Sequence, residues 1–226
     1  MTSVAAPVML RHGRVELALH TLRTSPTGRA LLLLHGLGEQ SPSEVPDEVA
    51  DWPGSIFALD FSGHGASTVA AGGGYSCEVL MGDVDTAIHH LGPATVLGRG
   101  LGGYVALLAA GARPTLVRGV VITDGPGLAG GGVRPGSHSI VLPVRPQAQT
   151  TPDPYALLEL GSDVRPPDYA TSFVRSATQS SGLEDPVIVS AVLRPPWLNG
   201  VANEYGVRTM ELPAAIAHFA ALLARH

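Results

Sequence analysis

The stretch Ala94–Ala110, ATVLGRGLGGYVALLAA, decides the fold of this chain. A short apolar run over Ala94–Leu97 gives way to a cluster of glycines, and apolar residues resume at helical spacing over Tyr104–Ala110. The pattern predicts a buried strand, a tight turn and a helix. Turns of this kind serve two chemistries. A G-x-S-x-G turn presents a nucleophilic serine, and a G-x-G-x-x-G loop seats a pyrophosphate on a helix N-terminus.

The turn itself, Gly98–Gly103, reads GRGLGG and is compatible with both patterns. Its glycines match the G-x-S-x-G pattern, but Gly100 stands at the serine position. Glycine has no side chain through which an acyl-enzyme could form. The turn also matches every position of the G-x-G-x-x-G pattern. Asp124 ends the next predicted strand about 20 residues later, where that pattern places a ribose-binding acid. Nucleotide or phosphate binding at this turn is therefore an open alternative.

The length and composition are compatible with a single globular domain. The chain has 226 residues, of which 45% are apolar and 15% charged, so residues 1–226 can bury one sizeable core. Its 14 basic residues are all arginines, form no basic stripe and leave a net charge of −5, which argues against nucleic-acid binding. The single cysteine, Cys77, excludes an intrachain disulfide and a zinc site built on several cysteines. We expect no cofactor and no metal.

No segment of the sequence predicts a membrane span. The N-terminus has no apolar run of signal-peptide length before Arg11, and nothing approaches about 18 consecutive apolar residues. We therefore expect a soluble, cytoplasmic protein without a membrane partner.

Outward from the central stretch, buried strands alternate with helices. We expect a hairpin over Val8–Thr24, around the turn dipeptide His12-Gly13. The predicted buried strands are Arg29–Leu34, Ser55–Leu59, Val117–Thr123, Tyr155–Leu160 and Pro186–Leu193, the last followed by a loop over Arg194–Arg208. The predicted helices are Pro46–Asp51, Ser76–Leu91, Pro167–Thr178 and Glu211–Ala224. This order indicates a mostly parallel sheet with an antiparallel N-terminal hairpin and helices on both faces.

Residues 125–154 depart from this alternation. They are rich in glycine and proline and have no clear periodicity, so we interpret them as a short excursion over the carboxyl edge of the sheet. Ligand sites of parallel sheets lie beyond that edge. The excursion is too short for a lid of several helices, so the site is either open or covered by a loop.

Three motifs at the carboxyl ends of predicted strands occur in the order and at the spacing of one known family. They are His35-Gly36, Asp60-x-x-Gly63-x-Gly65-x-Ser67 and Gly98-x-x-x-Gly102. The tail adds Gly206-x-x-x-x-Glu211-x-Pro213. Together they resemble the α/β-hydrolase fold family, from Val8 to the C-terminus. The resemblance implies an α/β-hydrolase-like sandwich with a reduced lid.

The resemblance also implies a catalytic serine, an acid and a histidine in that order, and this chain departs from two of the three. Gly100 stands at the nucleophile position. Val207 stands where the tail segment of the family carries histidine, and no histidine occurs between Ser139 and Ala217. Two independent losses predict a degenerate member of an esterase- and lipase-type family, one that does not hydrolyse esters through an acyl-enzyme.

The acid position, by contrast, is filled. Asp163 follows the predicted strand Tyr155–Leu160, and Asp124 is the alternative after the preceding strand. An aspartate with no histidine to orient has no role in a triad. A carboxylate that caps a helix or ends a loop is then the plainer interpretation.

The backbone part of the family's site is expected to survive. The resemblance assigns the oxyanion donors to the N–H groups of Leu101 and Leu37. A helix N-terminus favours anions whatever side chains surround it, and Arg99 adds a positive charge. The residues expected to bind a small acyl, carboxylate or other anionic ligand are Gly36, Leu37, Arg99, Gly100 and Leu101. The alternative is that Gly100 only relaxes the turn and that nothing binds there.

Three functional classes remain open. A module that binds a small molecule or a protein partner should leave the N–H groups of Leu37 and Leu101 free. An enzyme with displaced chemistry would use Asp163, His35, His64 or a bound cofactor, and it should place a histidine or cysteine within hydrogen-bond reach of a carboxylate in the pocket. A structural protomer of a homo-oligomer would fill the pocket with its own side chains.

Overall fold

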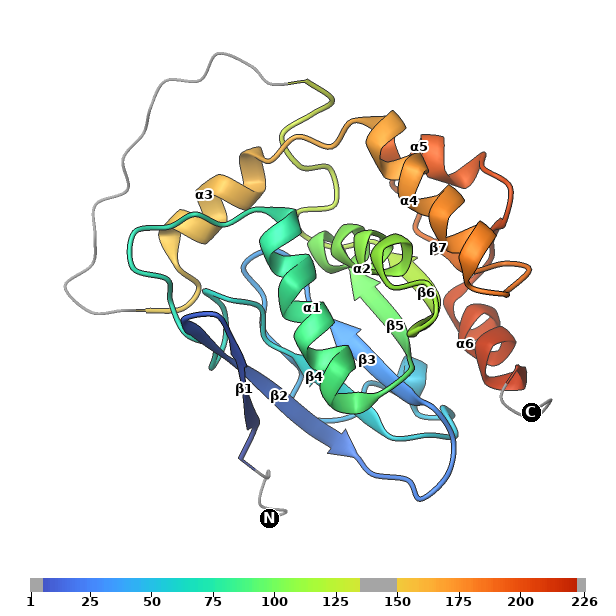
Figure 1. Ribbon diagram of the computed structural model, residues 1–226, viewed down its shortest axis with the longest axis horizontal. Helices are drawn as coiled ribbons and strands as arrows, with labels where there is room; N and C mark the ends of the chain where they lie inside the picture. The colour runs from blue at the N-terminus through green and yellow to red at the C-terminus, as the bar shows by residue number, and fades with distance from the viewer. Residues whose placement is uncertain (1–5, 135–149, 223–226) are drawn as a thin grey trace.

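A computed structural model describes residues 6–134 and 150–222. Within them the chain forms an eight-stranded sheet in the order β1-β2-β4-β3-β5-β6-β7-β8 (Figure 1). The strands are β1 (Val8–His12), β2 (Val15–Arg23), β3 (Ala30–Leu34), β4 (Ile56–Leu59), β5 (Ala94–Arg99), β6 (Val117–Thr123), β7 (Val187–Ser190) and β8 (Val207–Thr209). β2 pairs antiparallel with β1 and β4, and the other neighbours are parallel. The predicted fold class is confirmed.

Helices cover both faces of the sheet. They are η1 (Asp47–Val49), α1 (Cys77–Leu91), α2 (Leu101–Ala112), α3 (Pro154–Ser162), α4 (Pro167–Ser180), α5 (Pro196–Ala202) and α6 (Leu212–Ala221). Because successive strand residues point to opposite faces, Leu32 packs in a core cluster with α1 to α5, and Leu31 and Leu33 pack in a second cluster with η1 and α6. Among the described helices, none has the length and apolar character needed to cross a membrane.

The stretch Ala94–Ala110 forms the strand, turn and helix that its sequence predicts. β5 ends and α2 begins on either side of Gly100. The neighbouring glycines let the helix approach the strand closely, because a Cβ atom on Gly98 would lie 2.3 Å from the carbonyl oxygen of Gly102. The glycine cluster is therefore a packing requirement of this turn.

The N-terminal hairpin and the helix after residue 76 also confirm the prediction. β1 and β2 join through Gly13, whose φ is 60°. Ser76 is the N-cap of α1, and its hydroxyl accepts a hydrogen bond from the N–H of Val79 at 3.3 Å. Gly92 ends the helix with a positive φ of 78°.

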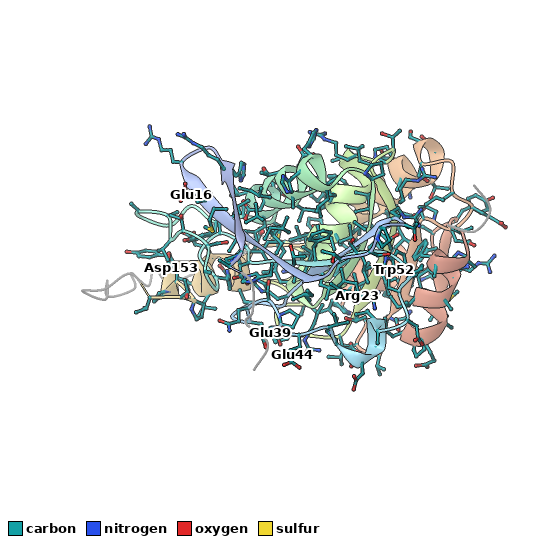
Figure 2. The ribbon with its side chains drawn as sticks, turned by 90° about the horizontal axis from the view of Figure 1, so that it is seen from below. Glu16, Arg23, Glu39, Glu44, Trp52 and Asp153 are labelled. Carbon is teal, nitrogen blue, oxygen red and sulfur yellow. The ribbon has the colours of Figure 1, made fainter. Side chains whose placement is uncertain are left out.

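The connection between β3 and β4 contains η1, which is shorter than the predicted helix Pro46–Asp51. Arg23 on β2 fixes this connection by donating to the carbonyl oxygens of Ala50 and Trp52 (Figure 2). The Trp52 side chain is buried, and its Nε1 donates to the carbonyl oxygen of Arg29 at 2.9 Å. This face of the sheet is thus covered by an anchored loop and one short helical turn together with α6.

The predicted strand Tyr155–Leu160 is wrong, because these residues lie in α3. Asp153 is the N-cap of that helix, and its carboxylate accepts a hydrogen bond from the N–H of Tyr155 at 3.2 Å. Pro154 occupies the first helical position, where its missing N–H has no helical partner to lose.

The C-terminal region contains one more strand than the sequence predicts. The predicted strand Pro186–Leu193 is β7, and it is not the last strand. The predicted loop Arg194–Arg208 contains α5 and the first residues of β8, which pairs with β7. The predicted helix Glu211–Ala224 is α6, although residues 223–224 lie outside the described part of the chain.

Of the predicted excursion over 125–154, residues 135–149 lie outside the described part of the chain. The preceding residues, 125–134, leave the carboxyl end of β6 as turns and bends. They return to the sheet edge at the β5–α2 turn, where the site was expected.

Candidate functional site

The turn between β5 and α2 holds Gly100 in a conformation that favours glycine. Its φ is 57° and its ψ is −118°. A Cβ atom here would lie 2.2 Å from the carbonyl oxygen of Pro126 and 2.5 Å from the carbonyl carbon of Gly125. The backbone that follows β6 therefore fills the space that a serine side chain would need.

The same Pro126 carbonyl group engages both predicted oxyanion donors. Its oxygen accepts a hydrogen bond from the N–H of Leu37 at 3.0 Å and another from the N–H of Leu101 at 2.9 Å. Two N–H groups that converge on one oxygen form the arrangement by which acyl-transfer enzymes stabilise an oxyanion. A binding module at this turn would require both N–H groups to be free, but both are already hydrogen-bonded within the protein. A carbonyl of the chain itself stands where a ligand oxygen would bind.

Residues 125–132, called the plug below, are held in place by buried side chains. Leu128 is only 3% exposed and packs in the larger core cluster. Its carbonyl oxygen accepts hydrogen bonds from Nε1 of Trp197 at 2.8 Å and from Nη1 of Arg165 at 2.6 Å. The Arg165 guanidinium also lies 4.6 Å from the centre of the Tyr104 ring. The plug is therefore anchored from two helices and from the chain segment before α4.

Arg99, which was expected to attract an anion, is paired with a carboxylate. Its Nε lies 3.1 Å from each carboxylate oxygen of Glu39, and its Nη1 donates to the carbonyl oxygen of Asp124 at 3.0 Å. Glu39 also accepts a hydrogen bond from the N–H of Gly36 at 2.9 Å. The positive charge beside the turn is therefore compensated within the protein.

Asp124 fixes the loop that follows β7. Its two carboxylate oxygens accept hydrogen bonds from the N–H of Val192 at 2.7 Å and from that of Leu193 at 2.9 Å. Both oxygens are thus engaged in holding this loop. The N–H of Leu101 at the start of α2 is engaged as well, so the geometry gives the nucleotide alternative no support.

The two histidines near the turn connect loops to one another. Nε2 of His35 accepts a hydrogen bond from the N–H of Phe61 at 3.1 Å, and its Nδ1 lies 2.8 Å from the carbonyl oxygen of Gly36. Nε2 of His64 accepts from the N–H of Gly38 at 3.2 Å. Burial, reinforced by the neighbouring His64, lowers the pKa of His35 to about 4, and burial also lowers the pKa of His64. Both rings are neutral structural groups.

Acidification below pH 6.5 is expected to destabilise the protein through His35. In the unfolded chain the ring has its ordinary pKa of 6.5, whereas the folded value is about 4, so between these values only the unfolded state takes up the proton. The free energy of unfolding, measured by urea titration, should therefore fall as the pH drops through this window. The His35→Gln variant should weaken this dependence, and the exposed His90→Gln control should keep it. An unchanged dependence in His35→Gln would contradict the assignment.

The described residues offer no support for displaced chemistry at the turn. Three histidines pair with carboxylates: His12 with Asp83 at 2.7 Å, His20 with Asp60 at 2.9 Å and His89 with Asp85 at 3.3 Å. His12 and His20 lie on β1 and β2, which β4 and β3 separate from β5, and His89 lies in the last turn of α1. Among the residues with described positions, no group of histidine, cysteine and acidic side chains could hold a metal ion.

Comparison with known proteins identifies the family. The family model for serine aminopeptidase, S33, matches residues 25–144, which is more than half of the chain. The chain belongs to this family of α/β hydrolases. No curated protein matches it.

Solved structures share the fold of this S33-family chain along nearly its whole length. A hypothetical protein from Pseudomonas aeruginosa PAO1 is 21% identical with a TM-score of 0.64, over 98% of this chain and 100% of that one. The thioesterase domain from the curacin biosynthetic pathway is 17% identical with a TM-score of 0.63, over 96% and 98%. A haloalkane dehalogenase from Agrobacterium tumefaciens C58 is 15% identical with a TM-score of 0.61, over 97% and 96%. At these identities the likeness concerns the fold alone.

In this S33-family chain, Asp163 does not follow a strand. It is the C-cap of α3, and its Oδ2 accepts a hydrogen bond from the N–H of Cys77 at the start of α1, at 2.9 Å. A carboxylate at a helix N-terminus is stabilising there, so the geometry supports the capping interpretation. Burial raises the pKa of the Cys77 thiol, which keeps that side chain protonated and inert.

Val207 does not lie in a loop either. It is the first residue of β8 and pairs with Val187 of β7. The connection from β8 to α6 consists of Met210 and Glu211. The segment after the last strand, where the resemblance places the catalytic histidine, therefore has no histidine in this S33-family chain.

The sequence did not reveal the role of the Pro126 carbonyl, Arg165 or Leu128. A backbone oxygen has no residue signature, and the available signal was indirect: Gly125-Pro126-Gly127 follows a strand next to a glycine at the turn. Trp197 packs edge-on against Tyr104, with ring centres 4.8 Å apart.

Proposed function

We propose that the protein is a non-hydrolysing member of its family, with a vestigial site closed by its own backbone, and that it works by binding. The observation that carries this proposal is the Pro126 oxygen, which accepts hydrogen bonds from Leu37 and Leu101. A substrate carbonyl would have to displace this oxygen before reaching the donors. Once there, it would find no nucleophile at Gly100.

An anionic ligand at the residues that the sequence predicts to bind it would also find the donor groups already engaged. Those residues are Gly36, Leu37, Arg99, Gly100 and Leu101. Two of their N–H groups are bonded to the plug, the N–H of Gly36 is bonded to Glu39, and the Arg99 guanidinium is paired with Glu39. A ligand could bind at the turn only by moving the plug, so the proposal places binding elsewhere on the fold.

Short-chain p-nitrophenyl esters test the absence of hydrolysis. The protein should release p-nitrophenol no faster than an equal amount of heat-denatured protein, and intact-mass measurement should find no acyl adduct, because the turn has no nucleophile. Turnover well above this blank that disappears in His35→Gln or His64→Gln would overturn the proposal, since it would show catalysis by side chains near the turn.

A further inference from the structure

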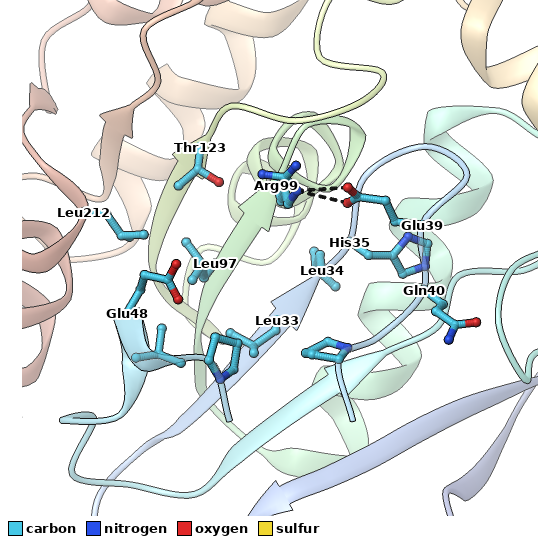
Figure 3. Close-up of a pocket in the computed structure, with 13 residues that line it drawn as sticks. Leu33, Leu34, His35, Glu39, Gln40, Glu48, Leu97, Arg99, Thr123 and Leu212 are labelled. Atoms are coloured by element: carbon cyan, nitrogen blue, oxygen red, sulfur yellow. Dashed lines mark hydrogen bonds and ion pairs between the residues drawn. The ribbon is translucent and has the colours of Figure 1, made fainter. Parts of the chain in front are cut away.

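A cavity of about 300 Å³ opens at the carboxyl edge of the sheet, on the face covered by η1 and α6 (Figure 3). None of the plug residues lines it, although Arg99 of the turn does. Two connections that contain no long helix leave room for it in the described structure. Between β3 and β4 there is only η1, and β8 reaches α6 through Met210 and Glu211. No helix therefore covers the ends of β3 and β5 on this face.

The walls of the cavity are apolar and come from three layers. The sheet, η1 with the loop before it, and the start of α6 contribute Leu33, Leu97, Val49, Pro42, Pro46 and Leu212. A concave site with apolar walls and a few polar groups at its mouth is the usual form of a small-molecule site. The volume is at the lower end of the range for such sites, which favours a small ligand with a compact apolar body.

The charges at the mouth of the cavity are not balanced. The ion pair between Arg99 and Glu39, with Nε–Oε2 at 3.1 Å, leaves no net charge. Glu48 is exposed on η1, and among the described residues it has no hydrogen bond or ion pair to its carboxylate. Figure 3 shows this carboxylate directed toward Leu97, across the mouth from Arg99. One uncompensated negative charge therefore borders an apolar cavity.

We infer that this cavity binds a small organic cation, in which a compact apolar body carries an ammonium group. The body enters between Leu33, Leu97 and Leu212, and the ammonium group remains at the mouth beside the Glu48 carboxylate. The net charge of −5 attracts a cation to the protein as a whole. This inference rests on the proposed function only in taking the protein to act by binding, since the cavity contains none of the plug residues that close the turn.

Three probes with nearly the same apolar body distinguish the head groups: 2-phenylethylamine, 2-phenylethanol and 3-phenylpropionate, titrated by calorimetry at neutral pH. The amine should bind about two- to five-fold more tightly than the alcohol, the size expected for an exposed ion pair, and the carboxylate should bind most weakly. Added salt should reduce the preference for the amine. A tighter carboxylate would overturn the inference and assign the head group to Arg99.

Two variants on the same turn provide a matched comparison. Glu48→Gln should abolish the preference for the amine, whereas Asp47→Asn, which removes an exposed carboxylate that does not line the cavity, should retain it. Leu97→Phe should fill the cavity and weaken all three probes, with folding checked by circular dichroism. Unchanged amine binding in Glu48→Gln, or no binding of the amine to the parent protein, would overturn the inference. Ester turnover with amine binding intact would instead overturn the proposed function alone.

Discussion

Replacing Gly100 by serine is expected to lower the free energy of unfolding by about 3–5 kcal/mol and to create no esterase. Two effects add. A residue with a side chain is strained at a φ of 57°, and its Cβ would lie 2.2 Å from the oxygen of Pro126, which is backbone that rotamers cannot move aside. Urea titration measures the loss, and p-nitrophenyl ester hydrolysis tests for activity. Adding histidine at Val207 should not help, because that residue lies in β8.

Gly13→Ser is the matched control for this variant. Gly13 has almost the same φ, 60°, but a Cβ atom there would meet nothing within 4 Å. It should therefore show the conformational cost alone, about 1–2 kcal/mol. The difference between the two variants reports the clash with the plug. Equal losses would mean that the plug moves aside without resistance, and ester turnover in Gly100→Ser would mean that a nucleophile alone restores the site.

The central turn could be predicted because its residues have few alternatives. Glycines between an apolar strand and an apolar helix permit a close approach, and the structure uses Gly98 and Gly102 for that purpose. Likewise, Ser76 before α1 and Gly92 after it are capping residues with a direct physical role. Signals of this kind are local, so a single sequence contains them.

The error over Tyr155–Leu160 has a physical cause as well. The run YALLEL is short and apolar, and such runs fit a strand or a buried helix equally well. Asp153 followed by Pro154 is a helix start, and that local signal decides the case in the structure. The error then displaced the family's acid position onto Asp163, because that position is defined by the strand it follows.

The closure of the site could not be predicted from the sequence. It depends on where residues 125–132 return to the sheet, which is set by contacts with Arg165 and Trp197, far along the chain. The residues of the candidate site were predicted from the motifs, but the backbone carbonyl that engages its N–H donors belongs to a segment without periodicity. Long-range contacts of a glycine-rich segment leave no pattern in one sequence.

Leu128→Ala is expected to destabilise the protein by about 2–4 kcal/mol and to loosen the plug. The Leu128 side chain is 3% exposed in the larger core cluster, and it is the apolar anchor of the plug. Removing it leaves a cavity and weakens the hold on the Pro126 carbonyl. The N–H groups of Leu37 and Leu101 should then exchange with solvent through local opening of the plug. Urea titration and amide hydrogen exchange by NMR measure the two effects.

The N–H of Val120, which bonds to the carbonyl oxygen of Pro186, provides the internal reference for exchange. Global unfolding exposes every amide, so a purely global effect would lower protection at Val120 as much as at Leu37 and Leu101. Local loosening of the plug lowers the protection from exchange more at Leu37 and Leu101 than at Val120. Val133→Ala, at a 39% exposed side chain beside the plug, should change stability by less than about 0.5 kcal/mol and leave both amides protected. If Leu37 and Leu101 exchange without protection in the parent protein, the Pro126 carbonyl does not close the site in solution, and the vestigial turn is open to a ligand.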